Sequence, residues 1–413
     1  MPFRYRNFRL FFLARFAFLC AHHCLIVVLG QAVYELTHDP LQLGLIGLAI
    51  FLPRFGFAIV GGHVADRYHR QTIIACCRAA QIAVGVGIAL AGWYGFQPLW
   101  VLYALLFIGG TATAFDGPAS QALLPSLIAE HELHTAVAWS ATAMQAAMVL
   151  GPVLGGLLYS VHGDAHVALV VVVALRVVSA VCTAVMRVAP TPIDRTAFSW
   201  ERLLAGLRYV FTERVLLAVI SLDLFAVLFG GAVALLPIYA NDILHVGARG
   251  LGWLRAAPAV GALGVAVWLA GRAHFRHPGV VMLWCVALFG LATLVFGGSR
   301  NFALSLAALT VLGGADMVSV VVRGVLVQVR TPPAMRGRVS AVNLVFIGAS
   351  NELGEFESGL TAKWFGTVPA VLLGASATLA IAALWARWFP ELRALRGDDV
   401  PRHDAVESAE RSV

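Results

Sequence analysis

The chain has 413 residues, of which 60% are hydrophobic and only 12% are charged, and its mean hydropathy is +0.83. This composition excludes a soluble globular protein, because a chain of this length could not bury so much apolar surface in water. Long, unbroken apolar runs favour membrane-spanning helices over the alternating strands of a membrane barrel. The net charge of +7 does not indicate nucleic-acid binding, because the basic residues are not clustered on a soluble face.

Twelve apolar segments are long enough to cross a bilayer, in two sets of six. The first set is 8–36, 41–65, 72–91, 99–121, 135–159 and 165–188, and the second is 215–240, 250–270, 280–296, 302–327, 339–361 and 368–389. We predict an all-α polytopic membrane protein with a six-helix bundle at 1–188, a cytoplasmic linker at 189–214, a second six-helix bundle at 215–390 and a cytoplasmic tail at 391–413. The second half of the linker is typical of an amphipathic helix on the membrane surface.

Arginine residues determine the expected orientation. Loops on one side carry Arg67, Arg70, Arg195, Arg202, Arg272, Arg276, Arg330, Arg336 and Arg338, whereas the opposite loops carry little more than Arg249, Arg300 and Lys363. The positive-inside rule therefore places both termini in the cytoplasm of a bacterium, with the chain in its inner membrane. The first apolar run is too long for a cleaved signal peptide, so we expect a retained first helix.

The two halves of the chain resemble each other, as an internal repeat requires. Recurring positions pair Gln121 with Gln328, Pro125 with Pro332, Gly151 with Gly354, Gly156 with Gly359 and Gly163 with Gly366. One equivalent pair has opposite charges, since Asp116-Gly117 corresponds to Arg323-Gly324. We therefore expect two pseudo-symmetric bundles.

Three groups of motifs indicate a family. The stretch GGHVADRYHRQ after the second segment resembles the loop signature of the major facilitator superfamily, with Gly62, Asp66, Arg67 and Arg70 in matching positions. LGPVLGGLL in the fifth segment resembles the antiporter signature, with Gly151, Pro152, Gly155 and Gly156 in register and Ala147 where a further glycine is usual. NFRLFFLARF, VYELTHDPLQLGL and TPPAMRGRVSAVN resemble the drug/proton antiporter branch, which contains the enterobactin exporter and the macrolide efflux pumps.

The resemblance implies the major facilitator fold and a conformational latch at Gly62, Asp66, Arg67 and Arg70. In that fold the loop meets the start of the eleventh span near Val339. An ionised Asp66 would stabilise this helix N-terminus, and the two arginines would keep the carboxylate ionised. The alternative is that these residues are boundary charges that only face the cytoplasm.

A charged side chain inside a membrane span is expected to have a structural or functional role, because inserting it into the bilayer costs ~2.5–3.5 kcal/mol on insertion scales. A proton-coupling carboxylate has to change between its neutral and ionised forms. Glu352 and Glu355 are three residues apart and would repel each other, and Asp223 is alone on its segment. We rank the candidates Glu355 and Glu352, then Asp223, then Asp116 and Asp316. The alternative is that each carboxylate forms a permanent ion pair with Arg15, Arg54 or Arg323.

By the resemblance, the spans that line or flank a central cavity supply its candidate residues. The substrate-cavity candidates are Arg15, His22, Arg54, Met144, Gln145, Met148 and Arg323. Methionine surfaces suit bulky amphipathic ligands, and the arginines favour an anionic cargo. Arg78 and Arg176 are on peripheral spans, where structural pairing or snorkelling is expected. Cys20, His23 and Cys24 share one helical face, which is too few ligands for a metal site, so we expect no metal and no cofactor.

The predicted function is a proton-coupled exporter of a bulky amphipathic molecule, a siderophore or hydrophobic drug, working by alternating access. It would act as a monomer in the lipid bilayer and contribute to siderophore export or multidrug resistance. The alternative is a lysophospholipid or lipid flippase, or another facilitator-type carrier, without proton coupling. An enzyme is not indicated, because no catalytic constellation converges.

Overall fold

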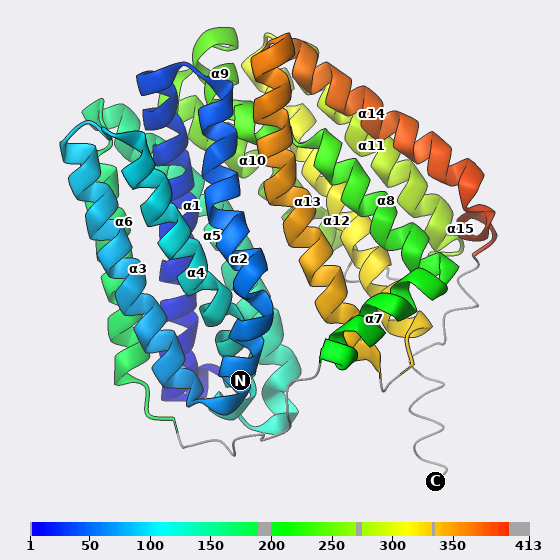
Figure 1. Cartoon of the computed structure of the whole chain (residues 1–413), viewed down its shortest axis with the longest axis horizontal. Helices are drawn as coiled ribbons and strands as arrows, with labels where there is room; N and C mark the ends of the chain where they lie inside the picture. Colours follow the sequence, from blue (N-terminus) through cyan, green and yellow to red (C-terminus); the bar gives the residue numbers. More distant parts are fainter. Residues whose placement is uncertain (1, 189–199, 270–274, 333–334, 396–413) are drawn as a thin grey trace.

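The computed structural model describes residues 2–188, 200–269, 275–332 and 335–395. All regular secondary structure in this part of the chain is helical, and eleven of its helical segments are long and apolar enough to cross a membrane. A further long helix, α13 (Arg336–Phe365), packs among them although its second half carries Glu352 and Glu355. The predicted all-α polytopic fold is confirmed (Figure 1).

The N-terminal bundle contains six helices whose ends follow local sequence signals. They are α1 (Arg6–Thr37), α2 (Pro40–Arg67), α3 (Arg70–Trp93), α4 (Leu99–Leu123), α5 (Leu133–His162) and α6 (His166–Val185). Asp39 caps α2 by accepting a hydrogen bond of 3.0 Å from the backbone N–H of Leu41, and Pro40 occupies the first turn. α5 ends where Gly163 adopts a φ of +74°, a left-handed conformation that glycine permits.

The C-terminal bundle begins with a broken span. Its helices are α8 (Arg214–Gly230), α9 (Leu236–Ile238), α10 (Gly247–Leu269), α11 (Pro278–Gly298), α12 (Phe302–Arg330), α13 and α14 (Thr367–Trp388). We expected one continuous segment over 215–240, but α8 stops at Gly230 and the chain continues through short 3-10 and π-helical turns to Ile243. Gly231 and the missing N–H of Pro237 account for the break.

The segment expected to form the amphipathic linker helix is α7 (Trp200–Thr212), which packs beneath the C-terminal bundle. Tyr209 donates a hydrogen bond of 2.9 Å to the carbonyl of Arg330, and Val210 is buried beside Val339. A short helix, α15 (Pro390–Ala394), follows α14. The rest of the predicted linker at 189–199, the basic loop at 270–274 with Arg272, and the tail at 396–413 lie outside the described residues.

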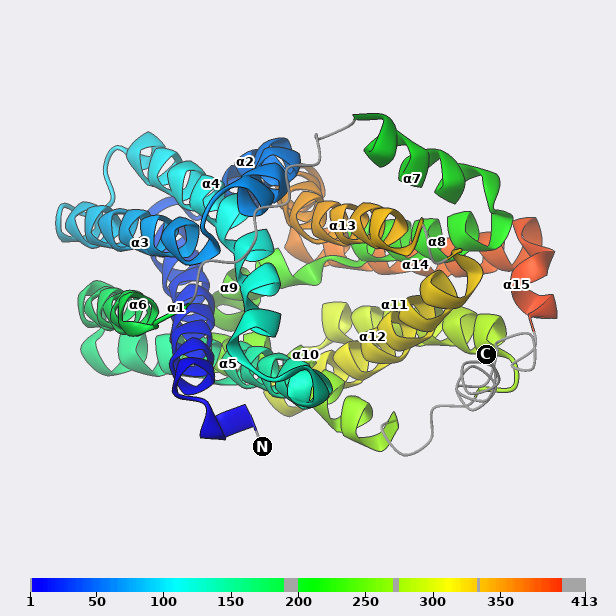
Figure 2. The same cartoon turned by 90° about the horizontal axis from the view of Figure 1, so that it is seen from below.

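The two bundles are joined near one face of the molecule. We call the face where α1 begins and α14 ends the terminal face, and the opposite one the far face. A Cβ atom placed on Gly44 of α2 would lie 3.1 Å from the Cα of Phe356, and one on Gly156 of α5 would lie 2.9 Å from the Cα of Gly252. Both glycines are in the half nearer the far face. Viewed from the terminal face (Figure 2), the pairs α2–α13 and α5–α10 connect the bundles.

Contact is lost toward the terminal face. A Cβ atom on Gly56 or Gly62, further along α2, would have no atom of the described chain within 4 Å. Arg54, Phe55 and Phe57 on the same stretch are exposed. The bundles are therefore closed at the far face and separate toward the terminal face, as the ribbons in Figure 1 show.

Candidate functional site

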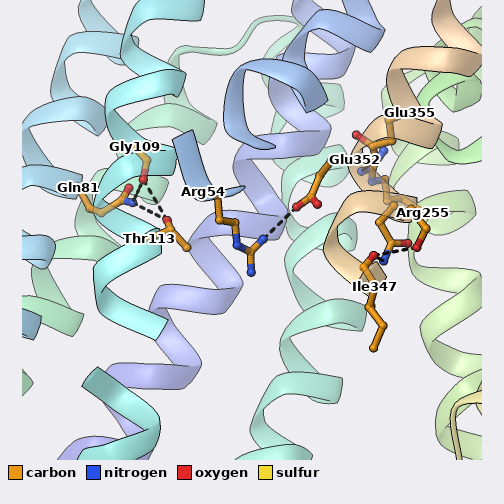
Figure 3. Close-up of polar contacts among 10 residues, drawn as sticks. Arg54, Gln81, Gly109, Thr113, Arg255, Ile347, Glu352 and Glu355 are labelled. Carbon is orange, nitrogen blue, oxygen red and sulfur yellow. Dashed lines mark hydrogen bonds and ion pairs between the residues drawn. The ribbon is translucent and has the colours of Figure 1, made fainter. Parts of the chain in front are cut away.

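An ion pair connects the two bundles where their contact ends. Nη1 of Arg54 on α2 lies 2.9 Å from Oε1 of Glu352 on α13 (Figure 3). The Arg54 side chain is 49% exposed and that of Glu352 is 17% exposed. Oε2 of Glu352 is buried and accepts no hydrogen bond within the described chain. This carboxylate therefore lies at the boundary between the closed half and the open half, with one oxygen unsatisfied.

Glu355, one helical turn away, forms a different kind of pair. Its Oε1 lies 3.0 Å from Nη2 of Arg255 on α10, in the same bundle (Figure 3). Arg255 also donates a hydrogen bond of 3.1 Å to the carbonyl of Val233, which belongs to the turn after the break in α8. A Cβ atom on Gly47 of α2 would lie 2.7 Å from Oε2 of Glu355, so the carboxylate is pressed against the closed interface. Sequence reasoning missed Arg255, although an arginine inside an apolar segment was the signal for it.

Two further predicted carboxylates are in buried ion pairs within a bundle. Asp116 on α4 pairs with Arg78 on α3 at 3.0 Å, and the Arg78 guanidinium lies 3.5 Å from the ring centre of Phe18. Asp223 on α8 pairs with Arg323 on α12, and both side chains are almost fully buried. The equivalent, oppositely charged positions 116 and 323 thus each supply one member of a buried pair. Arg78, rather than Arg15, Arg54 or Arg323, is the partner of Asp116.

The remaining predicted cavity and coupling residues are dispersed. Asp316 and Arg15 are half-buried, on α12 and α1 respectively. His22 on α1 lines a small cavity inside the N-terminal bundle. On the terminal-face half of α5, Met144 is exposed, whereas Gln145 and Met148 are half-buried. The other two substrate-cavity candidates, Arg54 and Arg323, are in the ion pairs described above.

The glycines of the predicted antiporter motif are contact points for helices. A Cβ atom on Gly151 would lie 2.7 Å from the Cβ of His23, and one on Gly155 would lie 2.8 Å from the carbonyl oxygen of Cys24. These two glycines and Pro152 are buried against α1 and α10, while Gly156 faces α10. Close approach of backbones at small residues is the usual way in which membrane helices pack. The motif therefore connects α5 both to its own bundle and to the other.

The predicted latch residues surround the end of α2. A Cβ atom on Gly62 would have no atom of the described chain within 4 Å, and Arg67 is exposed. Nη1 of Arg70 donates a hydrogen bond of 2.8 Å to the carbonyl of Ala122 near the end of α4. A cation at a helix C-terminus is favourable. The side chain of Asp66 lies outside the described residues.

A polar cluster at the far face was not predicted. Gln31 on α1 and Asn241 exchange two amide hydrogen bonds of 3.0 Å each, and the hydroxyl of Tyr34 donates to Asp242. Nζ of Lys363 lies 3.2 Å from Oδ2 of Asp39. We call this set the far-face lock: Gln31, Tyr34, Asp39, Asn241, Asp242 and Lys363. The four contacts just described join the N-terminal bundle to the C-terminal bundle. These residues lie near the ends of spans, where polar side chains are common, so the sequence did not indicate that they connect the two bundles.

Two helical bundles that are locked at one membrane face and separated toward the other define a secondary transporter, and no feature of the described chain resembles an enzyme active site. The sequence profile of the transmembrane secretion effector family matches residues 1–409. The chain therefore belongs to this family of major facilitator transporters, and it is a multi-pass bacterial membrane protein.

Relatives with assigned functions include exporters. The chain is 26% identical over 340 residues to the enterobactin exporter EntS of Shigella boydii serotype 18, covering 81% of this chain and 80% of the relative. Identity and coverage are the same for the enterobactin exporter EntS of Escherichia coli O1:K1.

Solved structures share the fold. A POT family transporter in complex with 5-aminolevulinic acid superimposes with a TM-score of 0.76 at 11% identity, covering 94% of this chain and 97% of the other. A bacterial homologue of the human lysosomal transporter Spinster, in an inward-facing and occupied conformation, gives a TM-score of 0.74 at 14% identity, covering 94% and 98%. At these identities the likeness concerns the fold alone.

Proposed function

We propose that this protein is a proton-coupled exporter of a bulky amphipathic small molecule, acting by alternating access as a monomer in the bacterial inner membrane. The proton gradient, rather than a cofactor, would supply the energy. The observation that carries the proposal is the ion pair between Arg54 and Glu352, which joins the bundles at the edge of the open half. The relatives named as enterobactin exporters support export as the direction of transport.

The distribution of arginine supports a cytoplasmic terminal face. The loops and helix ends there include Arg67, Arg70, Arg330, Arg336 and Arg338. The described conformation is then open to the cytoplasm, the state in which an exporter loads its cargo.

Glu352 is our candidate for the proton-carrying residue, in preference to Glu355. Glu352 is reachable from the open half and its pair with Arg54 crosses between bundles, so rearrangement of the bundles changes its partner. Glu355 and Arg255 belong to the same bundle and can stay paired in both states. In the cycle we propose, Glu352 is ionised and paired with Arg54 while cargo binds, and the outward transition of the bundles separates the pair. A proton from outside then neutralises Glu352 for the return, and it leaves when the cytoplasmic half opens again.

Arg54 also bears on the choice of cargo. Its guanidinium is about half exposed at the end of the open region and pairs with Glu352 through Nη1, so further N–H donors remain for an anionic ligand. Exposed Met144 and Trp139 on α5 add soft and aromatic surface in the same half of the protein. An anionic amphipathic compound, such as a catecholate siderophore, combines both requirements.

The latch is part of the same proposal. We place it at Gly62, Asp66, Arg67 and Arg70, and we expect it to close on the start of α13 when the cytoplasmic half closes. The open surroundings of Gly62 and the exposure of Arg67 support a released latch in the described state. Arg338 near the start of α13 packs on Gly206 of α7 instead.

The test is transport into inverted membrane vesicles that contain the protein. A catecholate siderophore, a hydrophobic dye and a fluorescent lysophospholipid would each be offered with and without a protonophore. We expect uptake of the siderophore or the dye that collapses with the gradient. Uptake of the lysophospholipid that is unaffected by the protonophore would instead favour a lipid flippase.

A further inference from the structure

The interior of the N-terminal bundle holds a guanidinium without a counter-charge. Arg176 on α6 is 4% exposed. Its Nη1 donates a hydrogen bond of 2.6 Å to the carbonyl of Gln81, and its Nε has no hydrogen-bond partner. No ion pair of the described chain includes Arg176. A buried charge without a partner is strongly unfavourable, so this side chain requires an explanation.

The buried carboxylate on α4 is already engaged. Asp116 pairs with Arg78, and this pair is neutral as a unit. Arg15 in the same bundle has a buried Nε that also lacks a hydrogen-bond partner. The described interior of the N-terminal bundle therefore carries an excess of positive charge.

A cavity of about 30 Å³ lies beside Arg176, between α1, α2, α3, α4 and α6. Its polar lining residues are His22, Gln81, Thr113 and Arg176, and most of the others are aliphatic. The side-chain amide of Gln81 already donates to the carbonyl of Gly109 at 2.7 Å and to Oγ1 of Thr113 at 3.1 Å (Figure 3). Arg176 is thus the cationic guanidinium with unused donor capacity in the lining, and no carboxylate lines the cavity.

We propose that this cavity binds a small monovalent anion, chloride under cellular conditions, as the counter-charge of Arg176. The volume corresponds to about two water molecules. A monatomic anion has a size that this volume admits. All lining residues belong to one bundle, and none of them takes part in the Arg54–Glu352 pair. Its role is structural: it neutralises a charge that holds α6 against α3.

The experiment measures thermal unfolding of the full-length protein in detergent. Sodium chloride and sodium gluconate are compared at constant ionic strength. An anion that binds only the folded state raises the unfolding midpoint, by about 2 °C for each tenfold increase in chloride above its dissociation constant. Arg176→Met should abolish the difference between the two salts. Arg249→Met, which removes an exposed arginine on α10, should keep it.

Two outcomes would overturn the proposal: equal midpoints in chloride and gluconate for the unaltered protein, or a chloride effect that persists in Arg176→Met. Crystals of the unaltered protein soaked in bromide give a second readout if the variant does not fold. We expect an anomalous peak next to the Arg176 guanidinium, and a cavity filled only by water would give none. Neither measurement involves transport, so failure here leaves the proposed function untouched.

Discussion

Arg54 and Glu352 are 298 positions apart in the chain, yet they form an ion pair of 2.9 Å between helices of different bundles. Such a pair depends on the conformation of the whole transporter. It contrasts with the Arg255–Glu355 pair one turn away, which is internal to the C-terminal bundle. The contrast generates distinct predictions for the two glutamates.

Glu352→Gln should uncouple transport from the proton gradient. The amide keeps the size of the side chain but cannot exchange a proton, so we expect gradient-driven efflux to fall about tenfold or more while cargo binding persists. The measurement is cargo uptake by inverted vesicles with and without an imposed pH difference. Glu357→Gln on the same helix is the control, because Glu357 accepts a hydrogen bond from its own-helix neighbour Thr361. Unchanged gradient dependence in Glu352→Gln would exclude this residue as the coupling site.

Glu355→Gln should behave differently. It leaves the partly buried Arg255 without its carboxylate, which costs several kcal/mol when one member of such a pair is removed. We expect a lower unfolding midpoint and less protein in the membrane, with the remaining protein still responding to the gradient. The double variant Glu355→Gln plus Arg255→Gln should recover part of the stability. A loss of coupling at normal stability would transfer the coupling role to Glu355.

The far-face lock should control the balance between open states. Asn241→Ala removes the two amide hydrogen bonds to Gln31, and each is worth about 0.5–1.5 kcal/mol. The population open at the far face should therefore rise roughly tenfold. Spin labels placed on the far-face ends of α1 and α10 would report the change as a longer interbundle distance. Ser160→Ala, at an exposed serine that bonds only within α5, serves as the control. Identical distance distributions for Asn241→Ala and the unaltered protein would show that the amide pair does not hold the far face closed.

Two glycines on α2 provide a matched pair of substitutions. Gly47→Ala puts a methyl group 2.7 Å from Oε2 of Glu355, which the closed far face can accept only by moving that side chain or the helix. Gly56→Ala meets no atom of the described chain within 4 Å and improves helix propensity by about 0.8–1 kcal/mol. We expect Gly47→Ala to reduce transport and Gly56→Ala to leave it near normal. Equal effects of both would show that the α2–α13 contact is not tight at Gly47.

The loop between α5 and α6 should contribute a small, pH-dependent stability. Hydrogen bonds from His166 hold the pKa of Asp164 below its ordinary value. A depressed carboxylate pKa stabilises the fold above the unfolded-state pKa, and this contribution disappears as the pH falls through the folded-state pKa. The unfolding midpoints of Asp164→Asn and the unaltered protein should therefore differ slightly at pH 7 and converge in acid. A difference that grows on acidification would contradict this sign.

The helices themselves could be predicted from sequence because the requirement for them is local. Each spanning segment needs enough apolar residues to cross the bilayer and must satisfy its backbone internally, and both properties can be read along the chain. Even so, the break after Gly230 was not anticipated, because membrane helices tolerate residues such as Gly231 and Pro237 where neighbouring helices satisfy the freed backbone groups.

Partners of the charged residues were decided by tertiary structure alone. A charged residue inside a span indicates that a partner is needed, but not which one. The choice of Arg78 over Arg15 for Asp116 depends on helices that meet from distant parts of the chain. The same is true of the pairing of Glu352 with Arg54 and of Glu355 with Arg255. The same holds for which membrane face is closed. Segment length and hydropathy act within a single helix, whereas ion pairing and closure act between helices, and only the assembled bundles bring those groups within bonding distance.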